Sequence, residues 1–179
     1  MSSSSGNSTG GPFDGGCACG ELRYRIHREP MFVHCCHCTR CQRETGGPFA
    51  HHAMVEFTEM STLQGDPEFV QVPTDSGGRH WVVRCRTCRT ACWNEHGSRS
   101  AITRYVRVGT LDDPNQMPPR AHIFVRSKQK WLVLPPDIPA FDDYYDASTT
   151  WPRESLARYQ VAKATRAEQQ KLAKAARKK

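Results

Sequence analysis

The sequence predicts a mostly-β fold followed by a basic, helical C-terminal tail, and three observations support this expectation. Short apolar stretches of strand length recur along the chain. Clusters of Gly, Pro and Asp separate these stretches, for example at residues 46–48, 65–67 and 112–114. The last residues are instead rich in strong helix formers. Short strands punctuated by turn residues are typical of an all-β domain.

The expected strands follow from the hydrophobic pattern. Leu22, Tyr24 and Ile26 alternate with polar residues, which is the period of a half-buried strand. Six further strands are expected from short apolar runs, at residues 53–57, 69–72, 81–83, 105–108, 122–125 and 131–134.

The chain divides into three expected segments. Residues 1–12 are rich in Ser and Gly and are predicted to be disordered. Residues 13–151 form one domain, which is long enough to bury a core. Residues 152–179 form a basic tail that is helical or disordered, because its apolar stripe is weak and promises no stable buried face.

The net charge of +7 is confined to this tail. Residues 1–152 contain 16 Lys and Arg and 16 Asp and Glu, whereas residues 153–179 contain 9 and 2. The body is therefore neutral, and the charge does not mark it as a nucleic-acid-binding domain. The tail is either a solubilising or targeting extension or a contact for an acidic partner such as nucleic acid or the cytoskeleton.

The start of the chain has neither the basic nor the apolar region of a secretory signal. No apolar run approaches the roughly 20 residues that span a bilayer, so no membrane partner is expected. The nine cysteines are an odd number, which argues against a complete disulfide framework. We therefore expect a cytoplasmic protein, or a nuclear one if the tail is a targeting signal.

Four of the cysteines have the spacing of a structural zinc site. Cys17 and Cys19 form a C-x-C pair, and Cys85 and Cys88 form a C-x2-C pair far along the chain. Two short pairs separated in sequence are the usual way to build a site with four thiolates. Such a closed site would stabilise the fold.

Three other cysteines predict a site of a different kind. Cys36, Cys38 and Cys41 lie within six residues, so their thiolates can bind one zinc ion and leave a fourth position open. An open position can take water, a thiolate or a carbonyl oxygen, which is the property of a catalytic site.

Four residues could close this second site instead: Cys35, Cys92, His34 and His37. Cys35 is adjacent to Cys36, so both could bind one ion only with strain. His37 lies inside the C-x-C and is expected to point away. Disulfides are a weaker alternative, because adjacent and C-x-C cysteines rarely reach the required geometry.

Three motifs resemble those of a known family. They are GGCACGELRY at residues 15–24, CHCTRCQRETGGPF at 36–49 and the C-x2-C at 85–88. The sequence resembles the glutathione-dependent formaldehyde-activating enzyme family, which also includes centromere protein V-like proteins. Further matches, such as GTLDDP at 109–114, extend the resemblance from about Phe13 to Asp143.

The resemblance implies a β-tent fold built around the four-thiolate zinc, with a second, catalytic zinc on Cys36, Cys38 and Cys41. It thus implies two zinc ions per chain, with glutathione as co-substrate. The activity it implies is condensation of formaldehyde with glutathione to S-(hydroxymethyl)glutathione, a carbon–sulfur lyase reaction run in reverse.

The sequence departs from the family pattern at four positions. Arg89 stands where Gly is usual, and Arg84 where an aromatic residue is common. His51 and His52 stand where small or apolar residues are expected. These departures concern the substrate more than the fold.

The implied chemistry needs a proton donor for the carbonyl oxygen while a thiolate attacks the carbonyl carbon. His37, His51 and His52 are the candidates by their nearness to the triplet, and we take His52 as the catalytic one. The alternative interpretation for each, a surface or packing histidine, is the commoner role. His51 and His52 face opposite sides of their strand, and the sequence does not show which side faces the zinc.

Glutathione is acidic, so its site needs cationic groups and hydrogen-bond donors. Arg40, Arg43 and Thr45 lie in or just after the triplet and are the candidate substrate-binding residues, unless they are solvated surface residues. The predicted function is therefore a zinc-dependent carbon–sulfur lyase or synthase. Its substrate would be a glutathione or other thiol adduct of an aldehyde or of a larger electrophilic metabolite. The alternative is a non-catalytic zinc-stabilised binding module that uses the basic tail.

Overall fold

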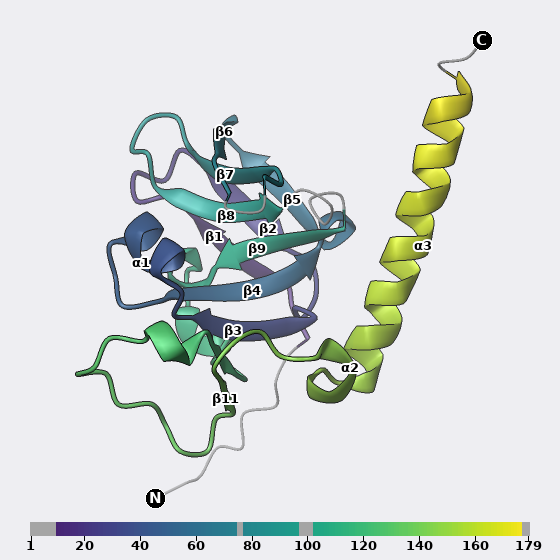
Figure 1. Cartoon of the computed structure of the whole chain (residues 1–179). Helices are drawn as coiled ribbons and strands as arrows, with labels where there is room; N and C mark the ends of the chain where they lie inside the picture. The colour runs from purple at the N-terminus through teal and green to yellow at the C-terminus, as the bar shows by residue number, and fades with distance from the viewer. Residues whose placement is uncertain (1–9, 75–76, 97–101, 177–179) are drawn as a thin grey trace, which may run out of the picture.

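The computed structural model describes residues 10–74, 77–96 and 102–176, and its strands form two sheets (Figure 1). The smaller sheet has the strand order β1-β2-β5, and the larger has the order β11-β10-β3-β4-β9-β8-β7-β6. The strands are β1 (Phe13–Gly16), β2 (Arg23–Ile26), β3 (Phe32–Cys36), β4 (Ala50–Glu56), β5 (Met60–Gln64), β6 (Pro67–Val72), β7 (His80–Cys85), β8 (Ala91–His96), β9 (Thr103–Arg107), β10 (His122–Ile123) and β11 (Ala140–Phe141). The α-helices are α1 (Thr39–Thr45), α2 (Ala147–Thr150) and α3 (Arg153–Ala176). The expected mostly-β fold with a C-terminal helix is confirmed.

One expected strand is wrong. Residues 131–134 form a turn and an irregular segment. Trp131 and Val133 are 68% and 88% exposed, so this apolar run has no sheet to pack against. Two prolines follow it directly, and proline cannot donate to a strand ladder.

The sequence pattern missed β1, β3, β5, β8 and β11. Strand β3 is buried along its whole length, because both of its faces are covered. A strand that is buried on both sides shows no polar–apolar alternation. Strand β1 is short and ends in two glycines, which carry no hydrophobic signal at all.

The main core fills the space between the two sheets. The rings of Tyr24 and Trp93 meet there edge to face, with centroids 5.9 Å apart and planes at 74°. Around them pack apolar residues from both sheets, including Leu22, Ile26, Val55, Val83 and Val106. Each sheet thus buries one face against the other.

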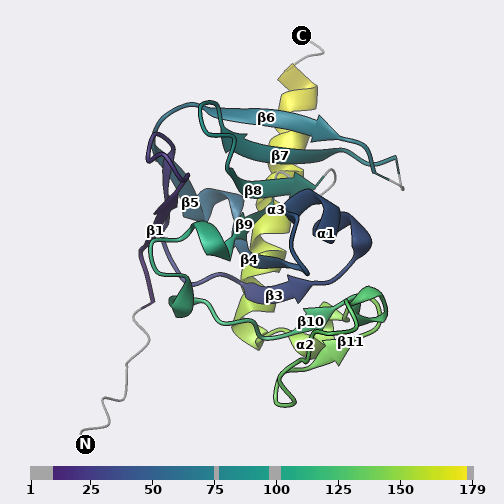
Figure 2. The same ribbon diagram turned by 90° about the vertical axis from the view of Figure 1, so that its left-hand side faces the viewer.

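A second cluster joins the other face of the larger sheet to Cys38 and Cys41 beside α1, to the segment before α2 and to the start of α3. Helices α1 and α3 lie at opposite ends of the strands (Figures 1 and 2). Phe32 of β3 packs there between two rings that come late in the chain. Its ring lies 5.1 Å from that of Tyr145 and stacks on that of Trp151 at 5.8 Å. These aromatic contacts fix the late segment beside β3.

Helix α3 is attached to the body more firmly than its weak apolar stripe predicts. Ser155 is buried, and Leu156 and Tyr159 pack against the aromatic cluster. Arg158 donates two hydrogen bonds, of 2.6 and 2.7 Å, to the carboxylate of Glu56 on β4. The last turns of α3 extend beyond the sheet edge formed by β6 (Figures 1 and 2).

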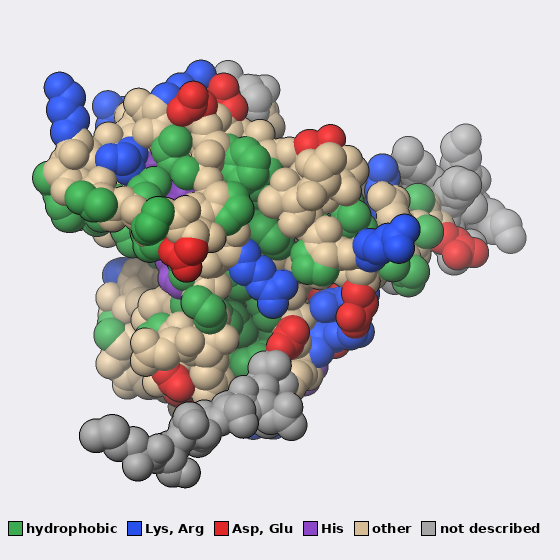
Figure 3. Space-filling model, turned by 90° about the horizontal axis from the view of Figure 1, so that it is seen from below, with side chains coloured by type: hydrophobic (Ala, Val, Ile, Leu, Met, Phe, Trp, Pro, Cys, Tyr) green, Lys and Arg blue, Asp and Glu red, His purple; other side chains and the backbone are tan. Residues whose placement is uncertain are grey.

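Basic and acidic side chains lie next to each other around the start of α3, as the view from below shows (Figure 3). A groove of about 720 Å³ runs between α3 and the strands beside it, with Phe57, Ile102 and Val161 among its lining residues. No helix among the described residues is long and apolar enough to cross a membrane. The predicted disorder of residues 1–9 lies outside the described residues.

Candidate metal centres

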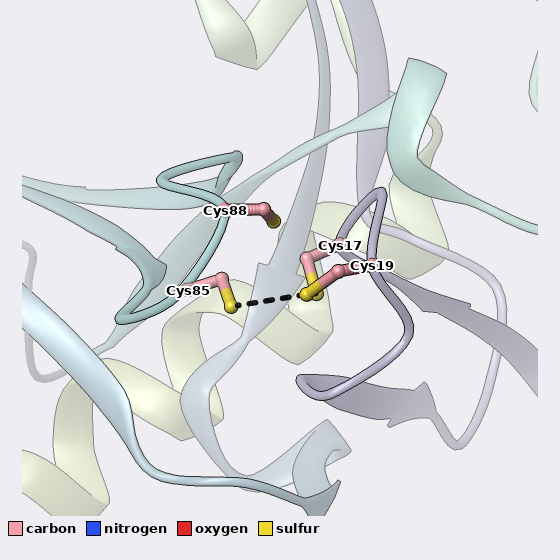
Figure 4. Close-up of side chains that lie close together, drawn as sticks. All are labelled: Cys17, Cys19, Cys85 and Cys88. Atoms are coloured by element: carbon pink, nitrogen blue, oxygen red, sulfur yellow. Dashed lines mark hydrogen bonds between the residues drawn. The ribbon is translucent and has the colours of Figure 1, made fainter.

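Four cysteines from two turns converge as the sequence predicts (Figure 4). Cys17 and Cys19 lie in the turn after β1, and Cys85 and Cys88 lie at the end of β7 and in the turn after it. The sulfur of Cys19 is 3.4 Å from that of Cys17 and 3.8 Å from that of Cys85. A tetrahedron with Zn–S bonds of about 2.3 Å has sulfur separations of about 3.8 Å, so this donor set fits zinc.

Hydrogen bonds to the sulfurs support this cluster. The backbone N–H of Leu22 donates to the Cys17 sulfur at 3.2 Å. The Cys88 sulfur lies 3.2 Å from the Thr90 hydroxyl, which lowers the pKa of the Cys88 thiol to about 5. Donors of this kind favour the thiolate form that a metal ligand requires.

Both arginines that depart from the family pattern near this cluster bind one carboxylate. Arg84 and Arg89 donate to the same oxygen of Glu68 on β6, at 2.7 and 2.6 Å. Arg89 has a φ of 64°, a left-handed conformation that glycine adopts without strain. The shared ion pair links β6 to β7 and to the turn that follows it, and neither arginine belongs to the four-cysteine cluster.

The second cluster lies where β3 leads into α1. Cys36 ends β3, Cys38 is the N-cap of α1 and Cys41 lies in its first turn. Their sulfurs all lie within 4.8 Å of one another. The backbone N–H of Cys41 donates to the Cys38 sulfur at 3.4 Å, so the helix start holds both residues in place.

The three thiols of this cluster share protons. Hydrogen bonds from Cys36 and Cys41 lower the pKa of Cys38 to about 2. The contact with Cys38 raises the pKa of Cys36 to about 12, and the contacts with Cys36 and Cys38 raise the pKa of Cys41 above its ordinary value. Three such groups cannot all ionise unless a cation compensates them, and a divalent metal ion bound by all three would do so.

The residues considered as a fourth ligand are engaged or directed elsewhere. Among the described residues, no Cys, His, Asp or Glu joins the three sulfurs as a ligand. His34 pairs with the Tyr145 hydroxyl at 2.9 Å, and His37 pairs with His122 at 2.9 Å. Burial raises the pKa of Cys35 and of Cys92 to about 12, which keeps both as neutral thiols.

The strand register places His52 on the face that carries the triplet. His34 pairs with His52 and Cys36 with Ala50, so these side chains share one face of β3 and β4. His51 pairs with Cys35 on the opposite face. His52 is 4% exposed, and its Nε2 has no hydrogen-bond partner in the part of the chain that the structure describes. Burial keeps the pKa of His52 well below its ordinary value, so the ring is neutral.

A polar contact that the sequence did not reveal fastens α1 to the sheet. Glu44 accepts a hydrogen bond of 2.8 Å from the Asn94 amide of β8 and another from the Arg107 guanidinium of β9. No residue of α1 is buried, so this contact and those of Gln42 do much to hold the helix. Gln42 donates to the carbonyls of His37 and Ser127 at 2.8 and 2.9 Å.

The three candidate substrate-binding residues lie in different environments. Arg40 lies half-buried in the first turn of α1, and its Nε has no partner among the described residues. Arg43 is exposed in the last turn of the helix. The Thr45 hydroxyl donates to the Cys41 carbonyl at 2.8 Å, so its donor is used within the helix.

This fold and these clusters define a class: a mostly-β protein with a four-thiolate and a three-thiolate cluster, each suited to one metal ion. The sequence model of the glutathione-dependent formaldehyde-activating enzyme family matches residues 12–127. The chain belongs to this family, and the expected resemblance is confirmed.

Two further comparisons add little. No curated protein matches the chain. The crystal structure of a Rhodobacter sphaeroides protein, a structural genomics target, shares 21% identity at a TM-score of 0.42. The match covers 55% of this chain and 87% of that one.

Proposed function

We propose that the chain makes and cleaves the carbon–sulfur bond of a thiol–aldehyde adduct, with Cys36, Cys38 and Cys41 holding a catalytic zinc ion and glutathione as the thiol. Family membership supports a glutathione-linked, aldehyde-activating function. The observation that carries the finer proposal is the three-thiolate cluster, which no fourth ligand closes among the described residues. Its neighbours His34 and His52 lie on the same face of the sheet.

When bound, zinc supplies a cation that binds an incoming thiol and lowers its pKa. His52 then moves the proton. Its neutral Nε2 accepts the proton that the thiol loses, and the thiolate sulfur attacks the aldehyde carbon. The carbonyl π electrons pass to the oxygen, which takes the proton back from His52 and becomes the hydroxyl of the adduct. Cleavage follows the same steps in reverse.

Position supports this role for His52. Same-face residues two apart on a strand lie about 6.7 Å apart, so His34 is one such step from Cys36 and His52 is the neighbour of His34 on β4. An adduct whose sulfur lies at the triplet can therefore present its oxygen toward His52.

The test compares two cysteines that lie three residues apart. Cys38→Ser removes a member of the triplet, whereas Cys35→Ser removes a buried thiol on the opposite face of β3. We expect Cys38→Ser to bind one zinc ion instead of two and to lose turnover of S-(hydroxymethyl)glutathione. Cys35→Ser should keep both. Zinc analysis and a turnover assay give the answer, and two bound ions with full turnover in Cys38→Ser would disprove the open catalytic site.

A further inference from the structure

Buried nitrogen atoms gather beneath α1, next to the triplet, without hydrogen-bond partners among the described residues. They include the Nε atoms of Arg40 and Arg107, which are donors, and both ring nitrogens of His80, one of which carries a proton in the neutral ring. His80 is only 3% exposed. A donor that is buried without a partner is destabilising, and native structures contain few such groups. Several in one place indicate a ligand that would satisfy them.

The strands connect these atoms into one site. His52 of β4 pairs with Arg107 of β9, so their side chains are neighbours on the face that carries Cys36. Arg107 extends from β9 to the neighbouring strand β8, where its guanidinium lies 3.5 Å from the Asn94 amide oxygen. His80 of β7 follows, with its ring against that of His96 at 4.1 Å. The donors thus extend from the triplet across the sheet.

The site already holds one carboxylate, but incompletely. Asn94 and Arg107 both donate to Oε1 of Glu44, whereas Oε2 lies 3.9 Å from Nε2 of His80, too far for a hydrogen bond. Arg107 uses Nη2 for Glu44 and leaves Nε without a partner. A guanidinium binds a carboxylate best through two such N–H groups. The two positive charges of Arg40 and Arg107 outnumber the single negative charge of Glu44 by one.

We propose that these donors form a carboxylate subsite, which binds a carboxylate group of the thiol adduct while its sulfur lies at the triplet. The inference rests on the proposed function and names the substrate class. Formaldehyde is too small and lacks the negative charge to use these donors. Arg107 lies two strands from β3, about 10 Å across the sheet, which an adduct several bonds long can span. The carboxylate belongs either to the thiol, as in glutathione, or to an aldehyde of the 2-oxo acid type.

Binding of four stable thioethers to the zinc-loaded protein tests this inference. S-methylglutathione has carboxylates on the thiol half only, and (2-hydroxyethylthio)acetic acid has one on the aldehyde half only. S-(carboxymethyl)glutathione has both, and 2-(methylthio)ethanol has none. Calorimetry on Arg107→Met, His80→Phe and the control Arg153→Met, at an exposed position of α3, measures each affinity. His80→Phe keeps the ring contact with His96 and leaves the hydrogen bonds of Glu44 intact. A loss of affinity in this variant therefore does not come from a displaced α1.

We expect Arg107→Met and His80→Phe to bind the carboxylated thioethers more weakly, Arg107→Met by about tenfold or more. Their affinity for 2-(methylthio)ethanol should not change, and Arg153→Met should bind all four thioethers like the unmodified protein. The affected half of the adduct identifies which carboxylate binds. Glu44→Gln removes the resident negative charge and should strengthen the same thioethers. Equal weakening of all four thioethers, or of none, would overturn the subsite. Carboxylate-dependent binding without turnover would instead overturn the proposed function.

Discussion

At the residue scale, His52 combines a position near the triplet with an unused nitrogen. Its pKa is held well below the ordinary value by burial, so it is a neutral base at every pH near neutrality. A neutral base in a dry site can take a proton from an incoming thiol without first losing one of its own. The adjacent His51 lies on the other face of β4 and has no such access.

His52→Gln should therefore lower kcat by about 10²- to 10⁴-fold while both metal ions stay bound, because glutamine can donate a hydrogen bond but cannot carry the proton. Steady-state kinetics and zinc analysis measure the two effects. His51→Gln is the matched control and should keep kcat within about threefold. A His52→Gln variant with normal kcat would show that another group moves the proton.

The cysteines are the part of the site that the sequence could predict, because ligand spacing is local and each pair lies within one turn. Which histidine faces the triplet could not be predicted, since it depends on the pairing of β3 with β4. Glu44, Arg107 and His80 carried no signal either. They come from α1, β9 and β7, and only the larger sheet brings them together. Thr45 shows the converse: it has the right chemistry and place in sequence, but its donor is used within α1.

At the scale of elements, a buried ion pair joins the first turns of α3 to β4, beside the apolar contacts of Leu156 and Tyr159. Glu56 and Arg158 have side chains that are 6% and 13% exposed. Arg158 also donates to the Glu29 carbonyl at 2.9 Å, so it joins the helix to two parts of the body. The weak apolar stripe of the tail could not predict this attachment, because the partner carboxylate lies about a hundred residues earlier in the chain.

Arg158→Met should destabilise the protein by about 3 kcal/mol, since it leaves the Glu56 carboxylate buried without its partner. Chemical denaturation measures the free energy of unfolding, and hydrogen exchange reports the loosening of α3. Arg153→Met, at an exposed position of the same helix, is the control. Adding Glu56→Met to Arg158→Met should restore much of the loss; if the single variant is as stable as the control, the ion pair does not anchor the helix.

At the scale of the whole molecule, buried neutral histidines make stability depend on pH. Burial lowers the pKa of His80 and of His51 to about 4, from 6.5 in the unfolded chain. The unfolded chain therefore binds these protons more readily than the folded one. The stability is fully present above pH 6.5 and is lost as the pH falls toward 4.

His80→Phe isolates one of these groups. His80 lies between the cations Arg40 and Arg107 and beside Glu44, and its ring should contribute about 1 to 3 kcal/mol to the loss between pH 6.5 and 4. The variant should lose correspondingly less stability over this range, measured by denaturation at each pH. Equal losses in the two proteins would show that protonation of His80 does not contribute to acid unfolding.

The doubled residues in β3 and β4 have a consequence for how the chain must fold. Cys35-Cys36 and His51-His52 are pairs of adjacent residues, so each strand carries the same residue type on both faces. If both strands shifted by one residue, Cys35 and His51 would replace Cys36 and His52 on the face of the site. The ligand chemistry alone therefore does not distinguish the native register from its nearest misfolded competitor. The discrimination must come from apolar neighbours, with Val33 and Ala53 in the core between the sheets and Phe32 and Met54 in the aromatic cluster. Packing on both sides of these strands decides which of two chemically similar rows becomes the site.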